Sequence, residues 1–249
     1  MRNVSWRGLG WPVLVLACLV LAALGARAGE FSVGRVDVKF SDEGWTEVPL
    51  PDSERTYGGD RNGALPVRSK LYVRGSTGSD VQVLVLVSAT QGGLGGGHMT
   101  YSPQCEPDPQ EYREGNSGFR RSFAQCLVVF PLYTSESVFK ELAPEIAELR
   151  RTGALSVRNA VYSVWSRHAI STGAFVDVRV FTVAPIEPSG GAVTESLPDG
   201  VLPAHVAWGR QLKEAVKSSV YSLSGRLDVP PLRLVPPSPP ASRAVALGG

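Results

Sequence analysis

The sequence predicts an α+β domain with a largely antiparallel β-sheet and two packed helices. Three observations lead to this class. Most segments between residues 29 and 228 carry apolar residues at strand periodicity, two carry them at helical periodicity, and a Ser-Thr-Gly turn joins two of the strands directly. About 200 residues is also a length that one domain with a sizeable core can hold.

Six segments are expected to form strands. Residues 81–89 (VQVLVLVSA) are nearly continuous valine, leucine and alanine, which predicts a central strand buried on both faces. The turn at residues 171–173 predicts a hairpin with the segments on either side of it. The full set of predicted strands is 31–40, 68–74, 81–89, 126–133, 156–171 and 174–184.

Two segments have the apolar period of an amphipathic helix. In residues 135–151, Pro144 is expected to kink or restart the helix, and the apolar stripe consists of Phe139, Leu142, Ile146 and Leu149. In residues 203–221, Pro203 suits the first turn, and the apolar stripe consists of Trp208, Leu212, Val216 and Val220.

A repeated pattern bears on the plan of the domain. Residues 63–68 (GALPVR) and 153–158 (GALSVR) match at five of six positions, and each is followed by a valine-rich strand and later by a helix. A duplicated β-β-α unit, covering residues 63–151 and 153–228, would produce this pattern. Strand sequences converge easily, so two similar hairpins that share one sheet are the favoured explanation.

The N-terminus has the three parts of a secretory signal peptide. Arg2 and Arg7 precede an uncharged run of 19 residues, and residues 26–28 (ARA) form a small-residue cleavage pattern. We therefore predict export to the periplasm or cell envelope of a bacterium, with residues 1–28 removed. The alternatives are an uncleaved membrane anchor, because about 20 apolar residues span a bilayer, and lipid attachment at Cys18.

Removal of this leader changes the charge balance. It takes away three arginines and no acidic residue, so 25 basic against 23 acidic residues becomes 22 against 23. A nearly neutral chain lacks the basic stripe that neutralises phosphates, so no nucleic-acid partner is predicted.

The glycine-rich residues 91–98 (QGGLGGGH) follow a strand, as a phosphate-binding loop does. His98 and Met99, however, stand where a Walker A loop needs a lysine and a hydroxyl residue. The segment after them is rich in proline and does not begin a long helix whose N-terminus binds phosphate. No nucleotide or other cofactor is therefore predicted.

No catalytic residue and no metal site is predicted. Residues 114–118 (EGNSG) resemble the nucleophile segment of chymotrypsin-like serine proteases, and His98, Asp108 and Ser117 follow that family's order. These three residues lie within 20 positions, whereas the family draws its triad from distant strands, so a turn is the favoured interpretation. The three histidines of the chain are scattered, without paired ligand spacing.

A long connection between strands is the strongest functional signal. Residues 90–125 show no clear strand or helix, and such lengths are uncommon unless the segment is functional or disordered. Cys105 and Cys126 remain after removal of the leader, and an even pair in an exported protein usually forms a disulfide. The connection carries residue types enriched in binding surfaces, and these candidate contact residues are Tyr101, Tyr112, Phe119, Arg120, Arg121 and Phe123. The alternative is that the aromatic residues only pack on the sheet.

The C-terminal residues 229–249 contain six prolines and no acidic residue. This composition is typical of a disordered tail, or of a docking segment or envelope tether.

The leading hypothesis is an exported, non-catalytic protein that binds a protein or envelope partner. The alternatives are an exported hydrolase whose acid and base come from separated loops, and an envelope structural factor held by the tail.

Overall fold

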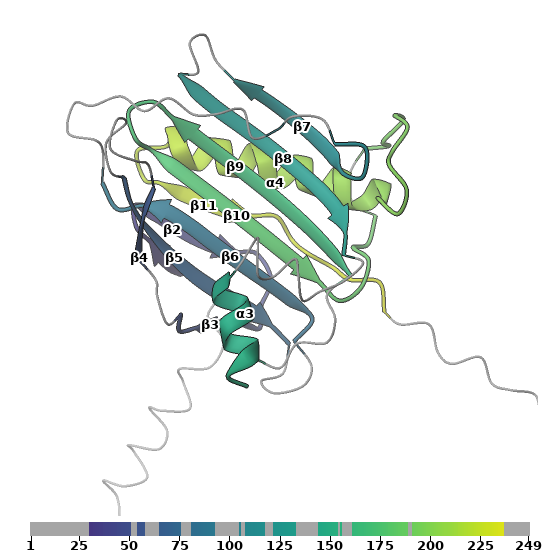
Figure 1. Ribbon diagram of the computed structural model, residues 1–249, viewed down its shortest axis with the longest axis horizontal. Helices are drawn as coiled ribbons and strands as arrows, with labels where there is room; N and C mark the ends of the chain where they lie inside the picture. Colours follow the sequence, from purple (N-terminus) through teal and green to yellow (C-terminus); the bar gives the residue numbers. More distant parts are fainter. Residues whose placement is uncertain are drawn as a thin grey trace, which may run out of the picture.

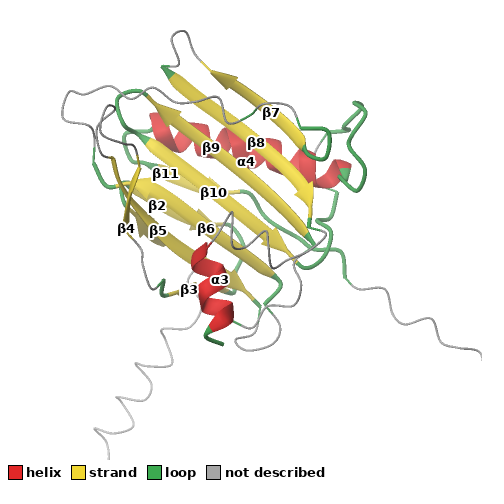
Figure 2. Ribbon diagram, viewed as in Figure 1, coloured by secondary structure: helices red, strands yellow, loops and turns green. Residues whose placement is uncertain are grey.

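The computed structural model describes residues 30–50, 54–57, 65–75, 81–92, 105, 108–117, 122–132, 144–153, 155, 161–188 and 191–236. The predicted signal peptide, including Cys18, lies outside these residues. Two β-sheets and two helices make up the described fold (Figure 2), as the predicted α+β class requires. Neither helix is long and apolar enough to cross a membrane.

In the described part of the chain, the main sheet has eight strands, each antiparallel to its neighbours. Its centre is formed, in spatial order, by β5 (Leu65–Arg74), β6 (Val83–Thr90), β10 (Phe175–Thr182), β9 (Tyr162–Ile170) and β8 (Phe123–Pro131). Shorter strands form the two edges: β7 (Tyr112–Ser117) pairs with β8, whereas β3 (Trp45–Val48) and β4 (Glu54–Tyr57) both pair with β5.

The small sheet joins the two ends of the described chain. It consists of β1 (Glu30–Val33), β2 (Val36–Phe40) and β11 (Arg226–Val229), and β11 runs parallel to β2. The sequence predicted one strand over residues 31–40, but the chain turns at Gly34, which has a φ of 56°. A Cβ there would lie 2.5 Å from the Thr90 carbonyl oxygen, so the close approach of this turn to β6 requires glycine.

The main sheet lies between two layers (Figure 1). α4 (Pro203–Tyr221) and the small sheet cover one face, and α3 (Pro144–Arg151) lies on the other. Alternate residues of the central strands supply the two apolar cores, as strand geometry requires. Val85 and Val178 pack toward Trp208 of α4, while Leu86 and Phe181 pack toward α3.

Several sequence predictions are confirmed. β6 is buried on both faces, and the hairpin at residues 171–173 forms, with the Gly173 N–H donating to the Ile170 carbonyl at 2.9 Å. The second predicted helix has the bounds of α4. The helix α3 begins at Pro144, which agrees with the predicted restart of the helix at that proline. Residues 133–143 lie outside the described part of the chain.

The described chain differs from the prediction at its C-terminal end. Residues 229–236 pack on the domain, because Leu232 is buried and its N–H donates to Asp42 at 2.9 Å. The indole N–H of Trp208 also donates to the Pro231 carbonyl at 3.0 Å. The first eight residues of the predicted tail therefore pack on the domain and contribute to its core. Residues 237–249 lie outside the described residues.

The hairpins β5–β6 and β9–β10 lie beside each other in one sheet, as the simpler explanation of the sequence repeat requires. Tyr72 and Tyr162 keep the 90-residue offset of the repeat. Tyr72 pairs with Val85 within the first hairpin, whereas Tyr162 pairs with Thr182 in the second, so these two tyrosines occupy different registers. The helices that follow the hairpins also cover opposite faces. Duplication of the whole β-β-α unit stays a prediction from the sequence.

Candidate functional site

A disulfide crosses over the edge strand β7 on the α3 side of the sheet. Cys105 is joined to Cys126 of β8, with a Cα–Cα distance of 5.6 Å, as the sequence predicted. Gly115 of β7 lies beneath this bridge, and a Cβ at Gly115 would approach the Cys105 Cβ to 2.4 Å. The absence of a side chain at this position therefore allows the crosslink to pass over the strand.

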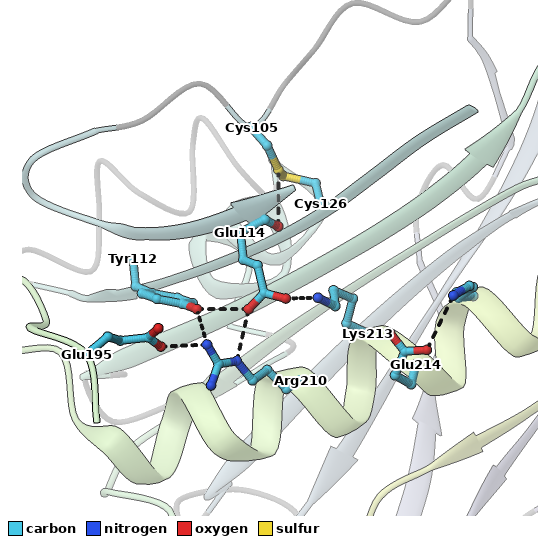
Figure 3. Close-up of polar contacts among 9 residues, drawn as sticks. Cys105, Tyr112, Glu114, Cys126, Glu195, Arg210, Lys213 and Glu214 are labelled. Atoms are coloured by element: carbon cyan, nitrogen blue, oxygen red, sulfur yellow. Dashed lines mark hydrogen bonds and ion pairs between the residues drawn. A yellow bond between two sulfur atoms is a disulfide. The ribbon is translucent and has the colours of Figure 1, made fainter. Parts of the chain in front are cut away.

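The opposite face of β7 is held to α4 by a charge network (Figure 3). Glu114 accepts a hydrogen bond from the Arg210 Nε at 2.9 Å and another from the Lys213 ammonium group. The Tyr112 hydroxyl donates to Glu114 at 2.8 Å and accepts from Arg210 at 2.7 Å, and Arg210 also pairs with Glu195. We call these five residues the β7–α4 network.

This network fastens the strand and does not present a free acid or base. Two cations hold the Glu114 carboxylate, so its charge is compensated within the domain. Burial raises the pKa of Tyr112, although the hydrogen bond and charge of Arg210 oppose that shift. The Tyr112 phenol therefore stays protonated near neutral pH and can donate to Glu114.

A second charge cluster lies on the α3 face of the sheet. Asp177 of β10 accepts hydrogen bonds from Trp165 at 2.7 Å and from Arg167 at 2.7 Å, and Arg179 pairs with it at 3.1 Å. Burial alone would raise the pKa of Asp177, but Arg179 and Arg167 hold it below its usual value. Asp177 is thus an ionised, satisfied carboxylate, separated by the sheet from Glu114.

Two histidines are buried between α4 and the main sheet: His205 belongs to α4, and His168 belongs to β9. Burial lowers the pKa of His168 and of His205 to about 4, so both rings are neutral at physiological pH. His205 accepts a hydrogen bond from the Ile186 N–H at 3.4 Å. His168 lies between Phe123, with ring centroids 6.1 Å apart, and Tyr221, at 5.3 Å. Within the described residues no His, Cys, Asp and Glu cluster could hold a metal ion, and His98 lies outside them.

Only two of the six predicted contact residues fall in the described part of the chain. Tyr112 is half-buried in the β7–α4 network, and Phe123 is half-buried against His168. Residues 112–117 also form a strand, where the sequence predicted an irregular connection. Four predicted contact residues lie outside the described residues: Tyr101, Phe119, Arg120 and Arg121.

Sequence reasoning missed a cavity at the end of the molecule where three turns meet. They are the β1–β2 turn, the β9–β10 turn and the segment between α4 and β11, and they enclose about 290 Å³. We call this space the end cavity. Val36, Thr90 and Val176 are buried at its wall, whereas Tyr221 is 57% exposed and Leu223 fully exposed at its rim.

Tight backbone contacts hold these turns together. The Arg35 N–H donates to the Thr90 carbonyl at 3.0 Å, and the Asp37 N–H donates to the Gly225 carbonyl at 3.2 Å. Gly225 has a φ of 65°, and a Cβ there would lie 2.1 Å from the Arg35 carbonyl oxygen. The end cavity is therefore a preformed feature of the backbone.

No protein-family model, curated protein or solved structure matches this chain.

Proposed function

We propose that the protein is an exported, non-catalytic binding protein of the bacterial periplasm or envelope, and that a partner contacts it at the end cavity. One observation carries this proposal: Tyr221 and Leu223 expose large apolar side chains at the rim of a preformed cavity. Large apolar side chains gathered at a concave site are typical of binding surfaces.

Phe123 connects this surface to the sequence prediction. It pairs in register with Ile170, which lines the end cavity. Phe123 and Tyr221 also contact the same buried ring, that of His168. One of the predicted contact residues thus lies beside the end cavity, which extends the proposed surface toward the edge of the sheet.

The residues of the end cavity favour binding over hydrolysis. Its walls contain no carboxylate, histidine or cysteine among the described residues, whereas general acid–base catalysis needs such groups within reach of one substrate. The disulfide between Cys105 and Cys126 supports export, because such bonds persist in oxidising compartments.

Site-specific photocrosslinking tests this function. A crosslinking amino acid replaces Leu223 in the full chain, expressed in a bacterium, and the matched control carries it at Val235, which is also exposed but lies beside Pro185, near the N-terminal end of α4. We expect a discrete adduct from position 223 and none from position 235. No adduct from position 223, or identical adducts from both, would contradict the proposal.

A further inference from the structure

The end cavity is bordered by hydrogen-bond donors without partners in the described structure. The guanidinium group of Arg35 is exposed and forms no ion pair with any described residue. The backbone N–H groups of Thr172 and Leu223 also have no partner there. No acidic residue lines the end cavity among the described residues. The charge at its mouth therefore complements an anion.

The walls between these donors are partly apolar. Ile170, Val176 and Val220 line the end cavity together with the exposed Leu223. Its volume of about 290 Å³ is at the lower limit of sites that enclose a whole small molecule, roughly 300–1,000 Å³. It is thus suited to one or two residues of a larger partner that combine an apolar side chain with a negative charge.

The C-terminal residue of a polypeptide has both groups on one Cα. Capture of a terminal carboxylate by backbone N–H groups is a recurring mode of peptide recognition. An arginine beside such donors adds a charge-assisted hydrogen bond, which is stronger than a neutral one.

We propose that the end cavity binds the C-terminal residue of a partner polypeptide. The apolar side chain of that residue enters the cavity, and its carboxylate binds Arg35 and the N–H groups of Thr172 and Leu223. This inference rests on the proposed function, because it assumes that a partner binds at this surface.

Peptide binding tests the inference directly. The protein is purified from the envelope of cells expressing the full chain, and fluorescence anisotropy is measured with a labelled Gly-Ser-Gly-Ala-Leu peptide. We expect the peptide with a free carboxylate to bind at least tenfold more tightly than its C-terminal amide. Arg35→Gln should remove most of that difference. The matched control is Arg226→Gln, an exposed arginine paired with Asp228, which should leave it unchanged.

Several results would overturn the inference. Equal binding of acid and amide would show that the carboxylate is not recognised, and equal binding of laurate would identify a lipid-type site. Tighter peptide binding by a chain that ends at residue 236 would identify the protein's own C-terminal residues as the occupant. If no peptide binds while position 223 still gives its crosslink, the inference fails and the proposed function stands; if the crosslink is also absent, both fail.

Discussion

The helix α4 meets two different environments along its length. In its middle, Arg210 and Lys213 are paired with Glu114 of the edge strand, so the charges there are compensated within the domain. At its C-terminal end, Tyr221 and the following Leu223 are exposed, and Arg35 of the neighbouring turn has no described ion-pair partner.

This difference separates groups that hold the fold from groups that are available to a ligand. A satisfied charge network needs nothing from outside, and removal of Glu114 leaves the largely buried Lys213 without its counter-charge. An exposed apolar side chain contributes little to stability, and its removal leaves the fold intact. Mutations in the two regions should therefore separate stability from binding.

Acidification should have the largest effect, through the histidines at both ends of α4. The pKa of His168 and of His205 is about 4 in the folded protein, against about 6.5 in an unfolded chain. The unfolded state therefore takes up protons first as the pH falls from 6.5 to 4. The free energy of unfolding should decrease by at most about 1.4 kcal/mol per pH unit for each histidine.

Urea unfolding at several pH values between 7 and 4 measures this slope. Stability should be constant above pH 6.5 on this account and level off below pH 4. His168→Phe should reduce the slope by about half, because one titrating ring is lost. An unchanged slope in that variant would show that His168 does not contribute.

The disulfide should have the next largest effect. Its removal by Cys105→Ser and Cys126→Ser should decrease the free energy of unfolding by about 3 kcal/mol. Gly115→Ala should cost about 2 kcal/mol in the oxidised protein, because the new Cβ meets Cys105. In the variant without the disulfide, the segment can move and the cost should decrease. Additive effects in a double-mutant cycle would contradict this coupling.

A smaller loss is expected from the β7–α4 network. Glu114→Gln should destabilise the protein by about 2 kcal/mol, because the largely buried Lys213 loses its counter-charge and Arg210 keeps only Glu195 as an ion-pair partner. Adding Lys213→Met should recover part of this loss. The control Glu214→Gln breaks an exposed pair with Lys217 on the same helix and should cost less than about 0.5 kcal/mol. Equal losses in thermal unfolding would remove the distinction between the two pairs.

The smallest stability effect is expected at the rim of the end cavity. Leu223→Ser and Tyr221→Ser should each change the free energy of unfolding by no more than about 0.5 kcal/mol, because both side chains are exposed. The same variants should weaken binding of the free-carboxylate peptide severalfold in anisotropy titrations. A large loss of stability would instead assign these residues to the core.

The parts of the fold that could be predicted are those in which the pattern of neighbouring residues alone indicates burial or a turn. The apolar run in β6 and the stripe of α4 reflect burial, and the glycine at residue 173 marks a turn. β7 could not be predicted, because its sequence YREGNS is polar on both faces. It forms through pairing with β8, a disulfide on one face and ion pairs to α4 on the other, all of which are long-range contacts.

The end cavity was equally inaccessible to sequence reasoning. Arg35, Thr172 and Leu223 each belong to an ordinary turn, and nothing in any one turn indicates the other two. They meet only because β2 pairs with β11 and the hairpin β9–β10 lies beside β6. Phe123 was predicted as a contact residue from composition, without any indication of its neighbours.

The parallel pairing of β2 with β11 has a consequence for biogenesis. Ser41, next to β2, donates to the Val229 carbonyl across 188 positions of the chain, so the small sheet cannot close before nearly all of the domain has been synthesised. Contacts of such sequence separation form slowly. A nascent chain therefore keeps the apolar face of its main sheet uncovered until late, and the proposed export would use this delay, because an unfolded chain passes through a secretion channel. Chains truncated before residue 226 should aggregate instead of folding.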